Sequence, residues 1–95
     1  MSLKLEMFDA DTANPEHGPR GPGHAAGVEV DYDYQAEQWV QDTSQDRPKF
    51  VRWELYDAET NTLLAKWERR ADKKVVMIER SPAFRGEWAI GVAFP

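Results

Sequence analysis

Carboxylates are the side chains whose types and spacing first suggest chemistry in this chain. Calcium takes about six to eight oxygen ligands, and carboxylates on flexible loops often supply them. The sequence has no glycine-containing calcium loop, and acids along one strand face are usually solvated and protect a sheet edge from aggregation. We therefore expect no metal and no cofactor. If a calcium site exists, its candidate ligands are Asp9, Asp11, Glu29, Asp31 and Asp33.

The two histidines offer a second set of possible ligands. His17 and His24 lie in a stretch rich in glycine and proline, with Asp9, Asp11 and Glu16 nearby. Imidazole and carboxylate together suit zinc or nickel. The spacing of seven residues between the histidines matches no ligand motif, so we expect solvated loop side chains.

Groups for nucleophilic catalysis are sparse in this sequence. It contains no cysteine, and its serines (Ser2, Ser44 and Ser81) stand in no nucleophile-elbow motif. A histidine that acts as a general base must be held in a fixed geometry, which a loop rich in glycine and proline does not favour. We therefore expect a protein that is not an enzyme.

Aromatic side chains give the clearest indication of a binding role. Three of the tryptophans fall on apolar faces of predicted strands and are expected in the core: Trp53, Trp67 and Trp88. Other aromatic residues stand near acids and the amides of Gln35, Gln38 and Gln41, where an exposed ring suits a protein interface or stacking on a sugar. The candidate partner-binding residues are Tyr32, Tyr34, Trp39 and Tyr56.

These observations favour a non-catalytic module that binds a protein partner or associates with itself. The alternative is an accessory module that binds carbohydrate or calcium, because aromatic rings and carboxylates serve those ligands too. An apolar sheet face or edge exposed in solution supports the first interpretation. A melting temperature that rises with calcium or a glycan supports the second.

The net charge of −5 is unevenly divided along the chain. Residues 1–46 carry ten acidic and two basic side chains, whereas residues 47–95 carry seven acidic and ten basic ones. Nucleic acid binds a concentrated basic face, so we expect none as a partner. The nearest approach to such a face is predicted to be the solvated end of a hairpin: Lys66, Arg69, Arg70, Lys73 and Lys74.

Signals for membranes and secretion are not evident in the sequence. No stretch approaches the roughly 18 apolar residues of a membrane span, so we expect no membrane partner. The first residues lack the basic start and apolar run of a signal peptide, and the absence of cysteine suits a reducing compartment. We expect the cytoplasm by a small margin, while a secreted protein or an excised domain stays open.

The elements that position these residues are predicted to be mostly strands. The clearest is a β-hairpin whose strands flank a turn at residues 57–62. Apolar and polar residues alternate along both strands, so Trp53 and Trp67 should lie on the same buried face. On the opposite face, Glu54 and Lys66 are placed to form a cross-strand ion pair.

Further strands are predicted from period-2 alternation and from β-branched runs. They are expected at residues 3–7, 28–34, 75–80 and 88–94. In the last of these, the larger side chains should share one face: Trp88, Ile90, Val92 and Phe94. Two stretches remain, of which 35–47 fits a helix, a strand or a loop and 14–27 forms one long loop rich in glycine and proline.

About six to seven short strands with turn signals between them predict an all-β fold, an antiparallel β-sandwich in one domain over residues 1–95. The tryptophan-bearing hairpin, the Ser81-Pro82 corner and the strand after Gly86 resemble fibronectin type III and immunoglobulin-like modules. The resemblance covers residues 50–94 and implies a sandwich. It assigns no functional residue.

Overall fold

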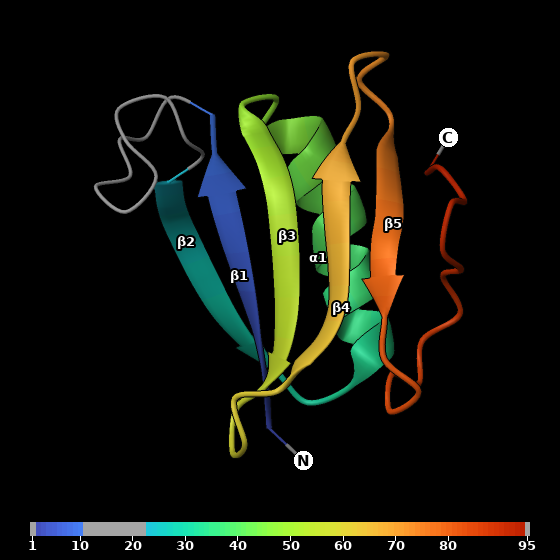
Figure 1. Ribbon diagram of the computed structural model, residues 1–95. Coiled ribbons are helices and arrows are strands. Elements are labelled where there is room, and N and C mark those ends of the chain that lie inside the picture. The colour runs from blue at the N-terminus through green and yellow to red at the C-terminus, as the bar shows by residue number, and fades with distance from the viewer. Residues whose placement is uncertain (1, 11–22, 95) are drawn as a thin grey trace.

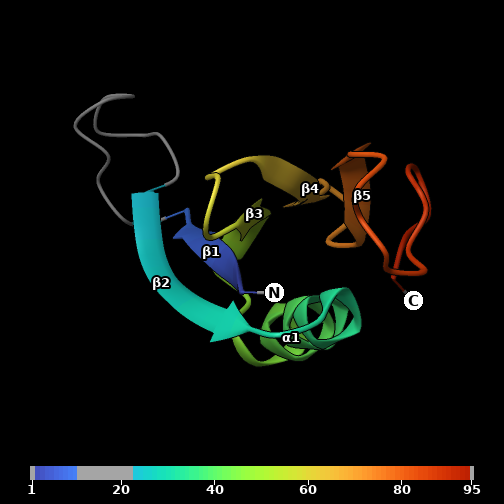
Figure 2. The same cartoon turned by 90° about the horizontal axis from the view of Figure 1, so that it is seen from below.

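The computed structural model describes residues 2–10 and 23–94, and this part of the chain is mostly β-structure (Figure 1). Five strands form one open antiparallel sheet in the order β2-β1-β3-β4-β5. One helix packs against a single face of this sheet (Figure 2). In chain order the elements are β1 (Leu3–Asp9), β2 (Gly23–Val30), α1 (Asp33–Asp46), β3 (Phe50–Asp57), β4 (Leu63–Arg69) and β5 (Val75–Arg80).

The helix carries the chain across β1. Both β2 and β3 pair with β1 in the antiparallel sense, so they run parallel to each other with β1 between them. Parallel strands need a crossover connection rather than a tight turn, and α1 supplies it. As a result, α1 lies behind the sheet in Figure 1 and follows directly after β2.

The hairpin predicted from the tryptophan pattern is confirmed. Trp53 of β3 pairs with Trp67 of β4, and both side chains are fully buried. Glu54 stands opposite Lys66 in the same register. Within β3, the Glu54 carboxylate accepts a hydrogen bond of 2.6 Å from the Tyr56 hydroxyl.

One core fills the space between α1 and the sheet. Trp53 crosses this space, and its Nε1 donates a hydrogen bond of 2.9 Å to Thr43 Oγ1 of α1. The rings of Phe84 and Trp88 meet Trp67 edge-on, with centroids 6.0 and 5.8 Å from it. Such aromatic pairs contribute about 0.5–1.5 kcal/mol beyond the burial of their area. The residues after β5 therefore complete the core.

The strand predicted over residues 28–34 ends earlier than expected, at Val30, and Tyr32 already caps the helix. The Gln35 side chain explains where the helix begins. Its Oε1 accepts hydrogen bonds from the backbone N–H groups of Asp31 and Tyr32, at 2.9 and 3.1 Å. The N–H groups at the start of a helix have no partner in the helix backbone. In the sequence the tyrosines alternate with acids as in a strand, so this cap is not evident there.

The ambiguous stretch at residues 35–47 is helical as far as Asp46. Ala36, Val40 and Ser44 recur every four residues and are buried on the side that faces the sheet. Only two of these three are apolar. The apolar stripe is therefore too short for the sequence alone to distinguish a helix from a strand.

The loop predicted over residues 14–27 is wrong in its last part, because β2 begins at Gly23, while residues 14–22 lie outside the described residues. Pairing with β1 holds this stretch extended. Gly27 suits the pairing, since a Cβ at that position would lie 2.8 Å from Glu6 Oε2. Tertiary contact with β1 thus overrides a composition that is typical of a loop.

The regular strand predicted over residues 88–94 is also wrong. This segment makes only isolated bridges to β5, and its larger side chains do not share one face. Trp88 is buried, whereas Ile90 and Val92 are 57% and 54% exposed. Gly91 adopts φ 82°, a left-handed conformation that interrupts the alternation of a strand.

A sandwich or immunoglobulin-like fold is not confirmed. A sandwich needs a second sheet packed on the first, and in the described residues α1 lies against the face that it would cover. The physical reason is that residues 33–46, which join parallel strands, fold as a crossover helix. No helix in the described part of the chain is long and apolar enough to cross a membrane.

Candidate functional site

A solvent-open groove lies between α1 and the end of β2. Its volume is about 640 Å³. The two elements line it together because only residues 31 and 32 separate the end of β2 from the start of α1. We call this feature the acidic groove, and its carboxylates and aromatic rings are those of Glu29, Asp31, Asp42, Asp46, Tyr34 and Trp39.

Helical spacing brings the α1 side chains to one wall of the acidic groove. Ala36 and Val40 are fully buried against the sheet, so the positions on the other sides of the helix are left for the groove. Gln38 and Asp42 are one turn apart, and Gln38 Nε2 donates a hydrogen bond of 3.0 Å to Asp42 Oδ1. This bond fixes the Asp42 carboxylate in the wall.

The charge of the acidic groove has one sign. Four exposed carboxylates line it, and no lysine, arginine or histidine belongs to its lining in the described residues. Carboxylates of one sign around a concave surface produce a potential that raises the local concentration of cations. The acidic groove is therefore suited to a cationic ligand or partner.

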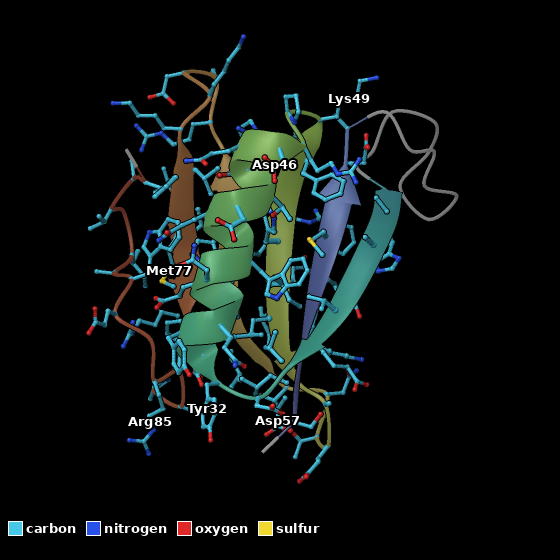
Figure 3. All side chains as sticks on the ribbon, turned by 180° about the vertical axis from the view of Figure 1, so that it is seen from behind. Tyr32, Asp46, Lys49, Asp57, Met77 and Arg85 are labelled. Carbon is cyan, nitrogen blue, oxygen red and sulfur yellow. The ribbon has the colours of Figure 1, made fainter. Side chains whose placement is uncertain are left out.

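Exposed aromatic rings give the acidic groove its second property. Tyr34 and Trp39 line it, and they are 63% and 42% exposed. Tyr32, labelled in Figure 3, stacks on Tyr34 with ring centroids 5.6 Å apart and an angle of 12° between the planes. A smaller hollow of about 240 Å³ shares Asp31 and Tyr34 with the acidic groove. Three of the four aromatic candidates thus gather along α1.

The fourth candidate, Tyr56, lies elsewhere. It belongs to β3 and is half-buried, and its ring lies 5.6 Å from Lys4 Nζ. Burial, together with the hydrogen bond to Glu54 and the negative charge of that carboxylate, raises the pKa of Tyr56 to about 12. Tyr56 therefore belongs to the network of the sheet and not to the acidic groove.

The five candidate calcium ligands do not converge. Glu29 and Asp31 line the acidic groove, whereas Asp33 is buried and its Oδ2 accepts a hydrogen bond of 2.7 Å from the backbone N–H of Arg85. Asp9 ends β1, and Asp11 lies outside the described residues. Within residues 2–10 and 23–94, no group of three or more histidine, cysteine or acidic side chains could hold a metal ion.

His24 lies on β2, away from the acidic groove. Its Nε2 contacts Glu6 Oε2, and its ring meets Phe8 edge-on at 5.7 Å. Both contacts join β2 to β1, so His24 has a role in strand pairing. His17 lies outside the described residues.

The five basic residues predicted at a hairpin end lie in three different places in the structure. Arg69 is partly buried beneath the hairpin, where it donates to backbone carbonyls. Arg70, Lys73 and Lys74 are exposed in the turn between β4 and β5. Lys66 lies further back, within β4.

Comparison with family models, with curated proteins and with solved structures finds no match for this chain.

Sequence reasoning missed two of the four carboxylates of the acidic groove. Asp42 and Asp46 follow Gln38 at intervals of four residues, which is the spacing of neighbours on a helix surface. That signal becomes informative only once residues 35–47 are assigned as helix. The buried carboxylate of Glu37, which accepts hydrogen bonds from the backbone of residues 87 and 88, has no sequence signal of its own.

Proposed function

We propose that this chain is a non-catalytic interaction module that binds a cationic protein segment in the acidic groove. One observation carries the proposal: two exposed aromatic rings, Tyr34 and Trp39, lie among four carboxylates that no basic side chain of the lining offsets. Aromatic residues and arginine are enriched in protein interfaces. Aspartate and glutamate are depleted there, so carboxylates clustered around exposed aromatic rings are a distinctive feature of this surface.

The combination of aromatic rings and carboxylates in the acidic groove indicates the chemistry of the segment that it binds. A tryptophan or tyrosine face attracts a guanidinium or ammonium group, with about 0.5–2 kcal/mol per contact as the site loses water. Carboxylates accept paired hydrogen bonds from arginine. Lysine- or arginine-containing segments satisfy both features at once, whereas an acidic or purely apolar segment satisfies at most one.

Carbohydrate and calcium are the alternative ligands. Tyr34 and Trp39 could stack on a sugar, but the neighbouring amides are already engaged, because Gln35 accepts from the helix start and Gln38 donates to Asp42. Sugar hydroxyls would then compete with existing hydrogen bonds. Calcium is less favoured, since the described carboxylates do not converge on one point.

The test uses an octa-arginine peptide as the cationic probe, titrated against the full chain by calorimetry. We expect saturable binding that falls at least tenfold in Trp39→Ala and in a double variant, Asp42→Asn with Asp46→Asn. The matched control, Glu59→Gln with Glu79→Gln, removes the same charge from exposed positions outside the acidic groove. We expect that control to bind with nearly unchanged affinity.

Equal loss in the two double variants would mean that the peptide responds to net charge alone, which contradicts a localised site. Calcium chloride and a chito-oligosaccharide serve as the comparison ligands in the same titration. Binding of either one that depends on Trp39, with none of the peptide, would replace the protein-binding proposal with the corresponding alternative.

A further inference from the structure

We infer that the cationic segment bound in the acidic groove is the turn between β4 and β5 of a second copy of this chain. The inference rests on the proposed function and names its partner. The turn comprises residues 70–74, which we call the basic turn, and its cations are Arg70, Lys73 and Lys74. The chain would then associate head to tail.

The cations of the basic turn are available for a partner. All five residues of the turn are exposed. The one acid among them, Asp72, lies 3.8 Å from Arg70 Nη2 in an exposed pair, and exposed pairs of this kind contribute little. In the described structure, the ammonium groups of Lys73 and Lys74 make no ion pair, so they can meet carboxylates of another molecule.

The basic turn is also held in one conformation. Arg70 and Lys74 close it through a hydrogen bond of 2.8 Å from Arg70 N to Lys74 O, and Asp72 Oδ1 accepts from Lys74 N at 3.0 Å. Beneath it, Arg69 Nη1 donates to the Lys73 carbonyl at 3.3 Å. A preorganised loop loses less conformational entropy when it binds than a flexible one.

The basic turn does not line the acidic groove of its own molecule, since Lys73 and Lys74 share a separate hollow with Ser44 and Gln45 at the end of α1. It extends β4 and β5 at the sheet edge opposite β2, and it projects beyond the end of the sheet (Figure 1). Figure 3 shows the hairpin on one side of α1, while β2 lies on the other side. Folding back would break the pairing of Arg69 with Val75 that closes the hairpin. With the hairpin intact and the basic turn outside the groove lining, we expect contact between turn and groove to form between two molecules.

The charge distribution of the whole chain supports this orientation. The acidic half of the sequence forms β1, β2 and α1, and the basic half forms β3, β4, β5 and the segment that follows. The acidic groove belongs to the first half and the basic turn to the second. The acidic groove of one molecule therefore attracts the basic turn of another, although each molecule has a net charge of −5.

The size of the contact predicts weak association. A five-residue turn buries less than the roughly 1,200–2,000 Å² of a stable interface, so we expect a dissociation constant on the order of 0.1–1 mM. A head-to-tail contact is heterologous and leaves one free groove and one free turn at the ends of every assembly. Assembly size should therefore grow with concentration rather than stop at a dimer.

The experiment measures solution mass by sedimentation velocity over a range of concentrations, with two variants. The groove variant carries Asp42→Asn and Asp46→Asn, and the turn variant carries Lys73→Glu and Lys74→Glu. We expect the unmodified chain to associate and each variant alone to remain monomeric. An equimolar mixture should form a one-to-one dimer and nothing larger, because only one intact groove and one intact turn are present in each pair.

Two results would overturn the inference: an unmodified chain that stays monomeric at millimolar concentration, or a mixture of variants that stays monomeric while the unmodified chain associates. Trp39→Ala serves as a second groove variant if the first does not fold. A monomeric chain that still binds octa-arginine through Trp39 leaves the proposed function intact and removes only the self-association. Failure of both measurements removes both.

Discussion

Arg69 shows why one member of a basic sequence cluster is unavailable to a ligand. Its Nε donates to the Phe50 carbonyl at 2.8 Å and its Nη2 to the Ser44 carbonyl at 2.9 Å. The guanidinium also lies 5.6 Å from the centre of the Trp53 ring. Burial lowers the pKa of Arg69 from its usual range, yet a guanidinium remains charged at any ordinary pH. Arg69 thus joins the end of α1 to the sheet.

Tyr56 should make the stability of the fold depend on pH in the alkaline range. Its pKa is raised from an ordinary value of about 10 to about 12, first by burial and then by Glu54. Since the folded state holds this proton more tightly, its contribution to stability is complete below pH 10. The contribution is lost as pH rises from about 10 through about 12, because the unfolded chain releases the proton first.

The measurement is urea unfolding at several pH values between 8 and 12. We expect the unmodified chain to lose stability relative to Tyr56→Phe as the pH rises above about 10. Glu54→Gln should reduce that difference, because it removes the charge that opposes ionisation. Tyr34→Phe, at an exposed position, is the control. Parallel pH profiles for the unmodified chain and Tyr56→Phe would contradict the assignment.

At the scale of elements, α1 holds the segment after β5 through two buried carboxylates. Asp33 accepts from the backbone N–H of Arg85. Glu37 accepts from residues 87 and 88 through its two different oxygens, at 3.2 and 2.6 Å. A Cβ on Gly86 would lie 2.6 Å from Glu37 Oε2, so glycine allows this close approach. The helix thereby fixes a segment that has almost no strand pairing of its own.

Glu37→Gln should therefore loosen the segment without unfolding the sheet. Glutamine keeps one acceptor oxygen, and its NH₂ group would face a backbone N–H that donates in the unmodified chain. Hydrogen bonds to charged groups contribute about 1.5–3 kcal/mol each. We expect faster amide hydrogen exchange over residues 85–91 and a red-shifted Trp88 emission. The exposed neighbour offers a control, Glu87→Gln, and equal exchange in both variants would count against the role of Glu37.

The sequence predicts well the strands in which apolar and polar residues alternate for a single physical reason. In β3 and β4, Trp53 and Trp67 alternate with polar residues because one face is buried and the other is solvated. The segment after β5 alternates in the same way, but it is held by α1 side chains far away in the sequence and by isolated bridges to β5. A local pattern cannot distinguish these two situations, so Ile90 and Val92 were expected inside and are exposed.

The candidate site was predictable in part, for a related reason. Tyr32, Tyr34 and Trp39 stand out because they are aromatic residues close to several acids and amides in the sequence. The placement of Tyr34 and Trp39 in one groove, with Tyr32 stacked on Tyr34, depends on the start of α1, which the Gln35 side chain sets through hydrogen bonds with the backbone. Tyr56 has a similar sequence neighbourhood but belongs to β3. Only the three-dimensional structure separates it from the others.

At the scale of the whole molecule, one core holds every element together. The same cluster contains residues of all five strands or their ends, of α1 and of the segment after β5. Small domains with a single core usually unfold in one cooperative step. A change in the centre of that core should therefore lower the stability of all elements equally, whereas a change at the surface should leave the fold intact and affect only binding.

Trp53 and Trp39 allow the same chemical change to be compared at these two positions. Trp53 is fully buried and Trp39 is 42% exposed. Trp53→Ala should cost about 3–5 kcal/mol, a large share of the roughly 5–15 kcal/mol of a small domain, with coincident urea transitions by circular dichroism and fluorescence. Trp39→Ala should shift the midpoint little while it weakens binding in the acidic groove. An unchanged midpoint for Trp53→Ala would contradict the hairpin register, and a large shift for Trp39→Ala would place that ring in the core.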